Sequence, residues 1–367
     1  MSNANTALVV RASDGQSPRL SKESIPQPRP AANQVLVKIS HVAQNPTDVQ
    51  SFDGNAFGDG AVLGCDFVGE VVELGSSVTR LAKGDIIAGL VWGGEVKGLG
   101  AYSEYCLADE RISFKLPGSI SRAEASTIPL AAATAWLAIF SKDCLALDRS
   151  QGKGNSILVW GGSSSVGLYS IQLASKLGFE VVTTCSDRHA DLVRSNGARH
   201  VFNYKDENVV EKIKAAAPNL SHTFDTIGAK GSSAAASQAF ASGPGTICTV
   251  RPGKANTEDV VEGTRVTDVL VWTAFLKDHS YGEFKWPVCV YPYSFSPLVS
   301  RAHISFKASQ EDHELVAELF EKIPEWVENG DLKPNRPKVL GGLDAVADGF
   351  EEYRDGKISA YKIVYEL

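Results

Sequence analysis

The stretch ILVWGGSSSVGLYSIQLASKLG at residues 157–178 has the residue types that bind a phosphate group. Glycines punctuate it at Gly161, Gly162 and Gly167, and small hydroxyl residues fill the middle at Ser163, Ser164 and Ser165. Glycine allows a tight bend after a buried strand, and the N–H groups at the start of the following helix attract a pyrophosphate. Although a strict GxGxxG is absent, we predict a dinucleotide site here. An ordinary turn of small residues is the alternative.

A second candidate contact follows the next apolar run, EVVTTC at 180–185. A site for NAD usually places a carboxylate there, whereas the 2′-phosphate of NADP needs hydroxyl groups and positive charge. We interpret Ser186 and Arg188 as phosphate ligands and Asp187 as a turn residue, with Asp187 as a ribose ligand for NAD left open. Tyr204 could flank the phosphate and stack on the adenine, or be a half-buried tyrosine at a strand end. NADPH is therefore the predicted cofactor.

The elements that must position these residues fall into two patterns. From about 33 to 127 the chain has short β-rich runs separated by Gly, Asp and Asn, which predicts an all-β domain. From 128 onward apolar strands alternate with helical stretches, as in a parallel sheet with crossover helices. The fold class is therefore α/β. The last run, YKIVYEL, has no such context and is expected to return to the first domain.

The composition of the chain argues against several classes of function. A chain of 367 residues with 43% hydrophobic residues predicts two well-packed domains. A net charge of -7 argues against nucleic-acid binding, and neither a membrane span nor a secretory signal is evident. Six cysteines, none in a CxxC pair, suit reduced thiols. We expect a cytoplasmic protein with a small-molecule partner.

Motifs along nearly the whole chain resemble those of a known superfamily. They include NPTD at 45–48, LGCDFVGEVVELGSSV at 63–78, IPLAAATAWLAIF at 128–140, VWGGSSSVG at 159–167 and DGKISAYKIV at 355–364. Their order is similar to that in medium-chain dehydrogenases/reductases of the zinc-independent, quinone-oxidoreductase-like branch. The set looks most like the fungal trans-acting enoyl reductases that serve polyketide synthases.

This resemblance implies a domain plan and a reaction. The plan is a chaperonin-10-like (GroES-like) β domain at 1–127, a doubly wound Rossmann domain binding NADPH at 128–305, and a segment at 306–367 that returns to the β domain. Catalysis is expected in the cleft between the domains. The implied reaction is NADPH-dependent reduction of an activated C=C bond, in which charge develops on the carbonyl oxygen. A free or carrier-bound acyl substrate, and a polyketide synthase as partner, are expected. Whether the protein is a monomer or a homodimer stays open.

The resemblance also implies site residues. The catalytic candidates are Asn45, Asp48 and Thr134, where Thr134 is a donor or proton relay; alternatively Asp48 caps a loop and Thr134 bonds back to its own helix. The expected cofactor set is Asn45, Pro46, Thr47, Asp48, Gly162, Ser163, Ser164, Ser165, Val166, Gly167, Ser186, Asp187, Arg188, His189, Tyr204, Val250, Arg251, Ser359 and Ala360. The expected substrate contacts are Leu130, Thr134, Leu137, Trp272 and Phe275. The aromatic segment at 268–295 either lines an acyl-sized pocket or covers a sheet edge.

Two departures from related enzymes matter. At the positions where the zinc-dependent branch holds its metal, this chain has Asn45, Cys65 and Leu130, and one thiolate cannot hold zinc. We therefore predict no metal. Related enoyl reductases often have a Lys where this chain has Gln50, and a neutral amide supplies neither charge nor acid. A slower reaction or another substrate is expected from that change.

Two other functions fit the same residues. A reductase of quinones or alkenals would use the same cofactor site, so only substrate kinetics would separate it from an enoyl reductase. A non-catalytic NADPH-binding protein would keep the cofactor set but turn over none of these substrates.

Overall fold

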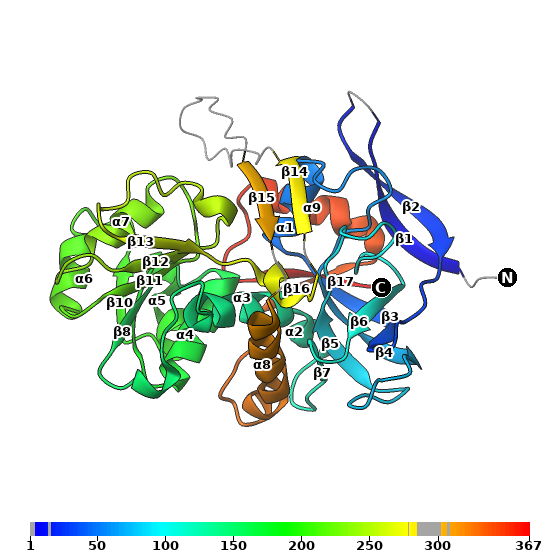
Figure 1. Cartoon of the computed structure of the whole chain (residues 1–367), viewed down its shortest axis with the longest axis horizontal. Helices are drawn as coiled ribbons and strands as arrows, with labels where there is room; N and C mark the ends of the chain where they lie inside the picture. The colour runs from blue at the N-terminus through cyan, green and yellow to red at the C-terminus, as the bar shows by residue number, and fades with distance from the viewer. Residues whose placement is uncertain (1–3, 14–15, 278, 285–301, 307–308) are drawn as a thin grey trace. The chain divides into compact units, whose positions relative to one another are not determined.

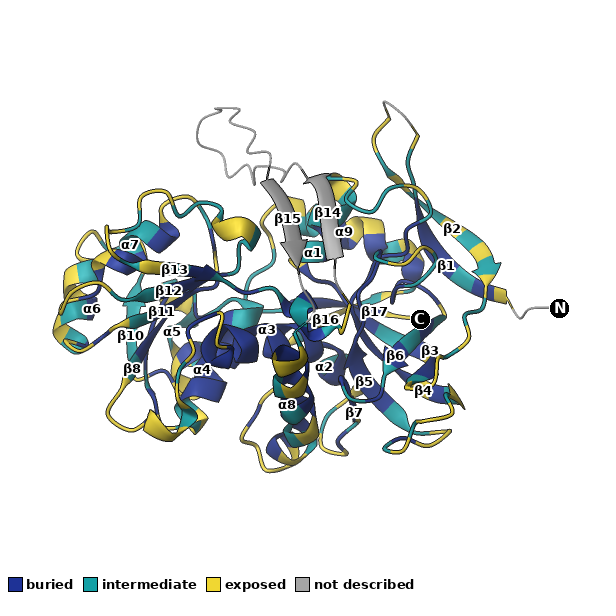
Figure 2. Ribbon diagram, viewed as in Figure 1, coloured by how far each residue is buried: buried dark blue, intermediate teal, exposed yellow. Residues whose placement is uncertain are grey.

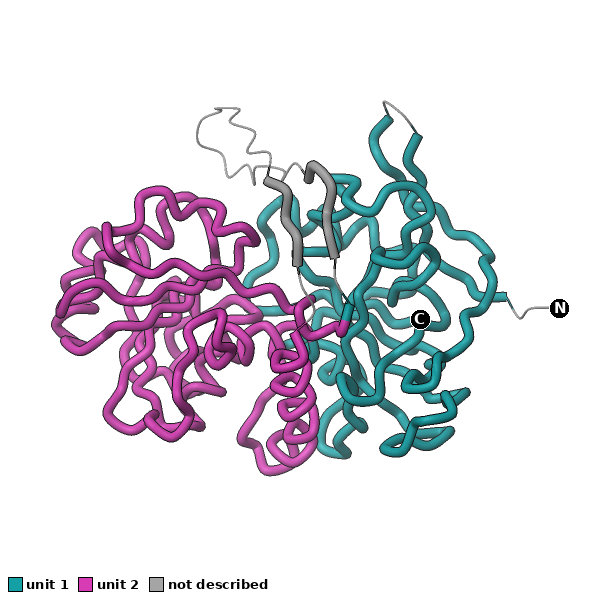
Figure 3. The backbone as a smooth tube through the Cα atoms, viewed as in Figure 1, with its two compact units in different colours: residues 1–129, 277–308, 336–367 teal, residues 130–276, 309–335 magenta. Residues whose placement is uncertain are grey.

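The computed structural model describes residues 4–13, 16–277, 279–284, 302–306 and 309–367. The chain forms two compact units, which Figure 3 colours separately. Unit 1 comprises Met1–Pro129, Lys277–Ala308 and Arg336–Leu367, and unit 2 comprises Leu130–Leu276 and Ser309–Asn335. Each unit has its own hydrophobic core.

Unit 1 is built on a sheet shared by the two ends of the chain (Figure 1), with strand order β16-β17-β3-β4-β5-β7 and β6 paired to β3. Its strands are β3 (Gln34–Ala43), β4 (Asp66–Leu74), β5 (Ile86–Leu90), β6 (Tyr105–Asp109), β7 (Ser113–Lys115), β16 (Pro337–Gly341) and β17 (Lys362–Glu366). Two hairpins add β1 (Ala4–Arg11) with β2 (Arg19–Pro26), and β14 (His279–Phe284) with β15 (Ala302–Phe306). The helices are α1 (Pro46–Asp53), α2 (Arg122–Ser126), α9 (Val346–Arg354) and the short η5 (Leu343–Ala345).

The C-terminal strand β17 lies between β16 and β3 and pairs antiparallel with β3, Val364 opposite Ala43. The run YKIVYEL thus supplies a strand to the sheet that contains β3 and β4. The hairpin β1–β2 was not predicted, because the predicted β-rich runs begin only at about residue 33. In β2, RLSKESIP, polar residues dominate and every residue is partly or fully exposed, so no clear apolar alternation marks it.

Unit 2 is a parallel sheet of order β10-β9-β8-β11-β12-β13. Its strands are β8 (Ser156–Trp160), β9 (Glu180–Cys185), β10 (His200–Asn203), β11 (His222–Asp225), β12 (Thr246–Thr249) and β13 (Arg265–Asp268). The central strand β8 is buried along most of its length (Figure 2). The chain winds outward from β8 to β10, then reverses through β11 to β13. The predicted α/β class is confirmed, and ligands of such sheets bind at the carboxyl ends where the order reverses, between β8 and β11.

The helices of unit 2 flank this sheet and follow its strands. They are α3 (Pro129–Phe140), α4 (Ser165–Lys176), α5 (Ala190–Ser195), α6 (Val209–Ala216), α7 (Ser232–Gln238) and α8 (Gln310–Glu328), with short 3-10 turns η1 (Arg149–Gln151), η2 (Asp187–His189), η3 (Pro252–Lys254) and η4 (Val271–Ala274). No helix within the described ranges is long and apolar enough to cross a membrane.

The helix α8 lies in unit 2, whereas the expected returning segment began at 306. Its first turn is tied to η4 by hydrogen bonds: Thr273 Oγ1 donates to Asp312 Oδ2 at 2.5 Å, and a ring nitrogen of His313 lies 2.8 Å from the carbonyl oxygen of Ala274. The return to unit 1 therefore starts near Arg336.

Candidate functional site

Glycines shape the turn between β8 and α4. Gly161 has φ 89°, a left-handed conformation that suits glycine. A Cβ on Gly162 would stand 2.1 Å from Thr183 Oγ1, and one on Gly167 would stand 2.4 Å from the carbonyl oxygen of Gly161. Ser163 lies within this turn and is partly buried. The helix can approach the sheet this closely only because both positions lack a side chain.

The N-terminus of α4 offers hydrogen-bond donors at the positive end of the helix dipole. Ser164 caps the helix, since its Oγ accepts from the N–H of Gly167 at 2.9 Å and lies 2.8 Å from Thr226 Oγ1. The Ser164 hydroxyl group therefore caps α4 rather than being available as a donor to a ligand. In the described part of the chain, the N–H groups of Ser165 and Val166 have no acceptor.

The carboxyl end of β9 leads into η2. Asn203 Nδ2 donates to Asp187 Oδ2 at 2.9 Å, so this carboxylate is held against the end of β10. Ser186 is partly buried and Arg188 is exposed. Burial, helped by the nearby Arg188 charge, lowers the pKa of His189, which favours a neutral imidazole.

Tyr204 follows β10 and is 46% exposed, so about half of its surface is buried, which fits both a ligand-stacking residue and a half-buried tyrosine at a strand end. Lys205 Nζ lies 5.8 Å from the centroid of its ring. Sequence reasoning missed Lys205, although a lysine directly after the tyrosine in VFNYKDE was a visible signal for a second positive charge.

The carboxyl ends of β11 and β12 carry polar groups that are held in place by hydrogen bonds. Asp225 is fully buried and its carboxylate accepts hydrogen bonds from Ile227 N–H, Gly228 N–H, Ser232 Oγ and Ser233 Oγ. Thr226 Oγ1 donates to the carbonyl oxygen of Trp160 at 2.9 Å, which ties β11 to the end of β8. Val250 N–H bonds to the Asp225 carbonyl, and Arg251 Nε donates to the Gly228 carbonyl at 3.0 Å. Asp225 and Thr226 were not predicted, although DTIG directly after a parallel strand was a usable signal.

The helix α3 is buried along its whole length. Thr134 is 8% exposed, and its hydroxyl has no hydrogen-bond partner among the residues described, so the back-bonding alternative is not what the structure shows. Leu130 is also nearly buried, and Leu137, at 1% exposed, has little surface to offer a substrate.

Trp272 in η4 and Phe275 just after it pack together, with ring centroids 5.9 Å apart. The bonds from η4 to α8 hold this short segment in place. Residues 278 and 285–295 of the aromatic segment lie outside the described part of the chain.

In unit 1, the motif NPTD starts α1. Asp48 Oδ2 accepts the backbone N–H of Asn45 at 2.8 Å, so the alternative in which Asp48 caps this loop is what the contacts show. Cys65 Sγ and Tyr102 OH also donate to the carboxyl group, each at 3.3 Å. Asp48 is 2% exposed, and burial raises its pKa to about 6. Pro46 is exposed and Thr47 partly buried.

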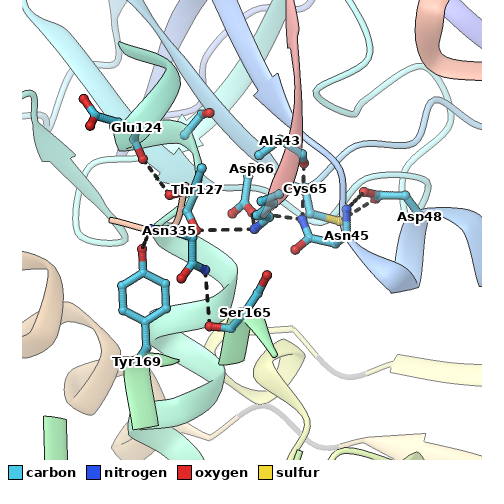
Figure 4. Close-up of polar contacts among 12 residues, drawn as sticks. Ala43, Asn45, Asp48, Cys65, Asp66, Glu124, Thr127, Ser165, Tyr169 and Asn335 are labelled. Atoms are coloured by element: carbon cyan, nitrogen blue, oxygen red, sulfur yellow. Dashed lines mark hydrogen bonds and ion pairs between the residues drawn. The ribbon is translucent and has the colours of Figure 1, made fainter. Parts of the chain in front are cut away.

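A buried ion pair next to this motif was not predicted. Lys362 Nζ lies 2.5 Å from Asp66 Oδ2, and the two side chains are 3% and 0% exposed. Asn45 Nδ2 donates to the same Asp66 oxygen at 2.9 Å, and Figure 4 draws Asn45 between Asp66 and Asp48. Ser359 and Ala360 precede Lys362 and are partly buried, and Ala360 has φ 55°.

Gln50 in α1 points to a neighbouring helix. Its Nε2 donates to Tyr353 OH, which belongs to α9, at 2.8 Å. This amide therefore joins two helices of unit 1.

Chemically, unit 2 offers N–H donors at a helix N-terminus and exposed cationic side chains at two neighbouring strand ends, a combination suited to a ligand with phosphate groups. Unit 1 offers a buried carboxyl group with a pKa near 6 and an amide held by a buried ion pair.

Comparison with known proteins matches both units. The model of the alcohol dehydrogenase GroES-like domain matches residues 31–118, and that of the zinc-binding dehydrogenase matches residues 165–269. The trans-enoyl reductase thnE of Trichoderma harzianum is 31% identical over 99% of this chain and 96% of its own. A zinc-type alcohol dehydrogenase-like protein of Schizosaccharomyces pombe is 29% identical over 96% of this chain and 98% of its own.

Solved structures share the fold. An alcohol dehydrogenase superfamily protein from Novosphingobium aromaticivorans superposes with a TM-score of 0.75, at 21% identity over 99% of both chains. The CurK enoyl reductase superposes with a TM-score of 0.73, at 17% identity over 99% of both chains.

Proposed function

This chain belongs to the medium-chain dehydrogenase/reductase superfamily, and we propose that it is an NADPH-dependent reductase of activated carbon–carbon double bonds in an enoyl thioester or an enone. As a member of that superfamily it is an oxidoreductase that uses a nicotinamide cofactor. The choice of NADPH, the type of double bond and the residue roles are the proposal.

The observation that carries the proposal is the turn between β8 and α4. A Cβ on Gly162 or Gly167 would collide with the sheet or the turn, and the Ser165 and Val166 N–H groups have no acceptor within the described residues. These features fit a pyrophosphate at the helix N-terminus. NADPH bound there supplies a hydride.

NADPH is favoured over NADH by the end of β9. The Asp187 carboxylate is held by Asn203, and Arg188 is exposed beside it. Lys205 brings a second cation to the neighbouring strand end. Two cations attract a 2′-phosphate, whereas an unengaged carboxylate would be expected for the 2′-hydroxyl of NADH.

The residues of this chain would serve the substrate in two ways. The Thr134 hydroxyl, which has no partner within the described ranges, donates to the carbonyl oxygen as negative charge develops there, or relays the proton to the α-carbon. Trp272 and Phe275, held by α8, provide an apolar surface for the acyl chain.

Zinc independence is part of the proposal. The Cys65 thiol donates to Asp48, and burial holds its pKa well above the ordinary value, so the thiolate that zinc requires is disfavoured. Asn45 and Leu130 are not zinc ligands, and across the described residues no group of three His, Cys, Asp or Glu side chains could hold a metal. The side chains present do not fit a catalytic zinc.

A carrier-bound acyl chain from a polyketide synthase is the proposed substrate class. Relatives from Trichoderma harzianum and Gibberella fujikuroi are named trans-enoyl reductases. Gln50 is bonded to Tyr353. We therefore assign Gln50 no contact with the substrate or its carrier.

Substitution of Arg188 tests the cofactor assignment. Arg188→Ala should weaken NADPH binding by about 10- to 100-fold and NADH binding by less than about threefold, because only the 2′-phosphate loses a charged hydrogen bond. Dissociation constants can be measured by titrating the fluorescence of each reduced dinucleotide.

Arg199→Ala is the matched control, because Arg199 pairs with Glu180 at the amino end of β9 and is 69% exposed. It should change neither affinity. Equal losses of NADPH and NADH binding in Arg188→Ala would contradict the assignment.

A further inference from the structure

A short segment without helix or strand, residues 331–335, follows α8 and is the last part of unit 2. It lies along one face of α4. That face carries a polar stripe whose members are spaced four, three and four residues apart, which places them one above another on the helix: Ser165, Tyr169, Gln172 and Lys176. Every member of the stripe has a hydrogen-bond partner in the segment.

The partners come in reverse order, so the segment runs antiparallel to α4. Asp331 Oδ2 lies 2.6 Å from Lys176 Nζ. The Gln172 amide bonds twice to the backbone of Lys333, because its Oε1 accepts the Lys333 N–H at 2.7 Å and its Nε2 donates to the Lys333 carbonyl oxygen at 3.2 Å. These contacts hold the C-terminal half of the helix.

Asn335 holds the other end of α4. Its backbone N–H donates to Tyr169 OH at 3.2 Å, and its Nδ2 donates to the carbonyl oxygen of Ser165 at 3.3 Å (Figure 4). Asn335 is 3% exposed and Tyr169 is fully buried. Because a carbonyl oxygen only accepts hydrogen bonds, the Asn335 amide presents its nitrogen to Ser165, whereas the reversed amide would set two acceptors against each other.

The carbonyl group of Ser165 and the N–H of Val166 belong to the same peptide group. This group is planar and trans, so its C=O and its N–H point in opposite directions. A donor that holds the Ser165 carbonyl therefore also fixes the direction of the Val166 N–H. It polarises the peptide group as well, which makes that N–H a stronger donor. Within the described residues the Val166 N–H has no acceptor, as is usual in the first turn of a helix.

We propose that Asn335 is a positioning residue that holds the peptide group between Ser165 and Val166, so that the Val166 N–H faces a phosphate group of the dinucleotide. The inference rests on the proposed function, because it assumes that the pyrophosphate lies at the N-terminus of α4. Asn335 acts through the helix and does not itself touch the ligand. All of these residues belong to unit 2.

The test compares two ligands that share a 2′-phosphate, since NADPH has a pyrophosphate and adenosine 2′-monophosphate has none. In Asn335→Ala the dissociation constant of NADPH should rise about tenfold, the effect of one hydrogen bond to a charged group. The dissociation constant of adenosine 2′-monophosphate should stay within about twofold of the wild-type value, because this ligand does not reach the turn. Isothermal titration calorimetry gives both constants without turnover.

Asn335→Asp is the second variant. It keeps the size of the side chain but sets an acceptor against the Ser165 carbonyl, so it should lose NADPH affinity in the same way, and it decides if Asn335→Ala does not fold. Asn196→Ala is the matched control. Asn196 Nδ2 donates to the Leu192 carbonyl oxygen of α5 at 2.7 Å, so this change removes the same kind of bond from another helix of unit 2 and should leave both constants unchanged.

Unchanged NADPH affinity in the folded Asn335 variants would overturn this inference and leave the proposed function standing. Equal losses for the two ligands would also overturn it, because a general disturbance of unit 2 would then be the cause. If the wild-type protein binds NADPH but not adenosine 2′-monophosphate, the comparison of Asn335→Ala with Asn196→Ala on NADPH still decides. Failure of the wild-type protein to bind NADPH at all would instead overturn the proposed function.

Discussion

The Asp48 carboxyl group illustrates how burial sets chemistry at the scale of one residue. It is 2% exposed and accepts hydrogen bonds from Asn45 N–H, Cys65 Sγ and Tyr102 OH. Desolvation nevertheless outweighs these bonds and raises its pKa from an ordinary 3.8 to about 6. Asp48 therefore changes charge in the range where many enzymes are assayed.

This shift predicts a pH-dependent stability. Because the folded-state pKa lies above the unfolded one, the contribution of Asp48 to the free energy of unfolding is largest below about pH 4 and falls by about 3 kcal/mol as the pH rises through 6. Asp48→Asn cannot ionise, so its stability relative to wild type should rise between pH 4 and pH 7. Urea unfolding at both pH values measures the difference.

The control is Asp59→Asn. Asp59 is exposed and its pKa is lowered by the N–H of Ala12 and by Arg11, so its contribution has the opposite sign. Parallel pH curves for wild type and Asp48→Asn would contradict the assigned pKa.

At the residue level, the sequence located features that lie in one short stretch but not contacts between distant residues. The glycines of 161–167 could be found because their spacing and flanking strand and helix lie in one short stretch. Lys362 could not, because its partner Asp66 is 296 residues away and a lysine is ordinarily exposed.

At the scale of the element, α4 and its turn depend on Gly167. Gly167→Ala would place Cβ 2.4 Å from the carbonyl oxygen of Gly161 and push the helix off the sheet. We expect a loss of about 1–3 kcal/mol in stability, from overpacking. NADPH affinity should fall about tenfold or more, because the N–H donors move.

Thermal unfolding and NADPH titration measure the two effects. Gly341→Ala is the control, since nothing lies within 4 Å of its added Cβ, and it should be neutral. An unchanged NADPH affinity in Gly167→Ala would show that the turn is not the phosphate site.

Prediction of the elements failed where contacts between distant residues determine the unit to which an element belongs. The helix α8 has a clear amphipathic pattern, so its existence was predictable, but its unit was not. Thr273 donates a hydrogen bond to Asp312, and the His313 ring lies within hydrogen-bond distance of the Ala274 carbonyl oxygen. These contacts join α8 to η4 across 39 residues of sequence, a separation that no local pattern spans.

At the scale of the whole molecule, most of the fold could be predicted from the order of the motifs along the chain. A strand-rich stretch of sequence, followed by alternating strands and helices, predicted a β unit and a parallel-sheet unit. Each of the two compact units has its own hydrophobic core. The C-terminal strand was predictable because YKIVYEL had no helix to continue a parallel sheet. The substrate was not, because pocket shape depends on side chains brought together from several elements.

The most direct test of the account is the initial rate of NADPH oxidation, with NADH in parallel, against crotonyl-coenzyme A, a longer 2-enoyl thioester, a free enal, a benzoquinone and an aldehyde. We expect turnover of the thioesters with NADPH and little with NADH. Turnover confined to quinone or enal would contradict the enoyl-reductase assignment. Aldehyde reduction stimulated by zinc would contradict the metal-free mechanism, and tight NADPH binding with no turnover of any substrate would mean that the protein is not an enzyme of this class.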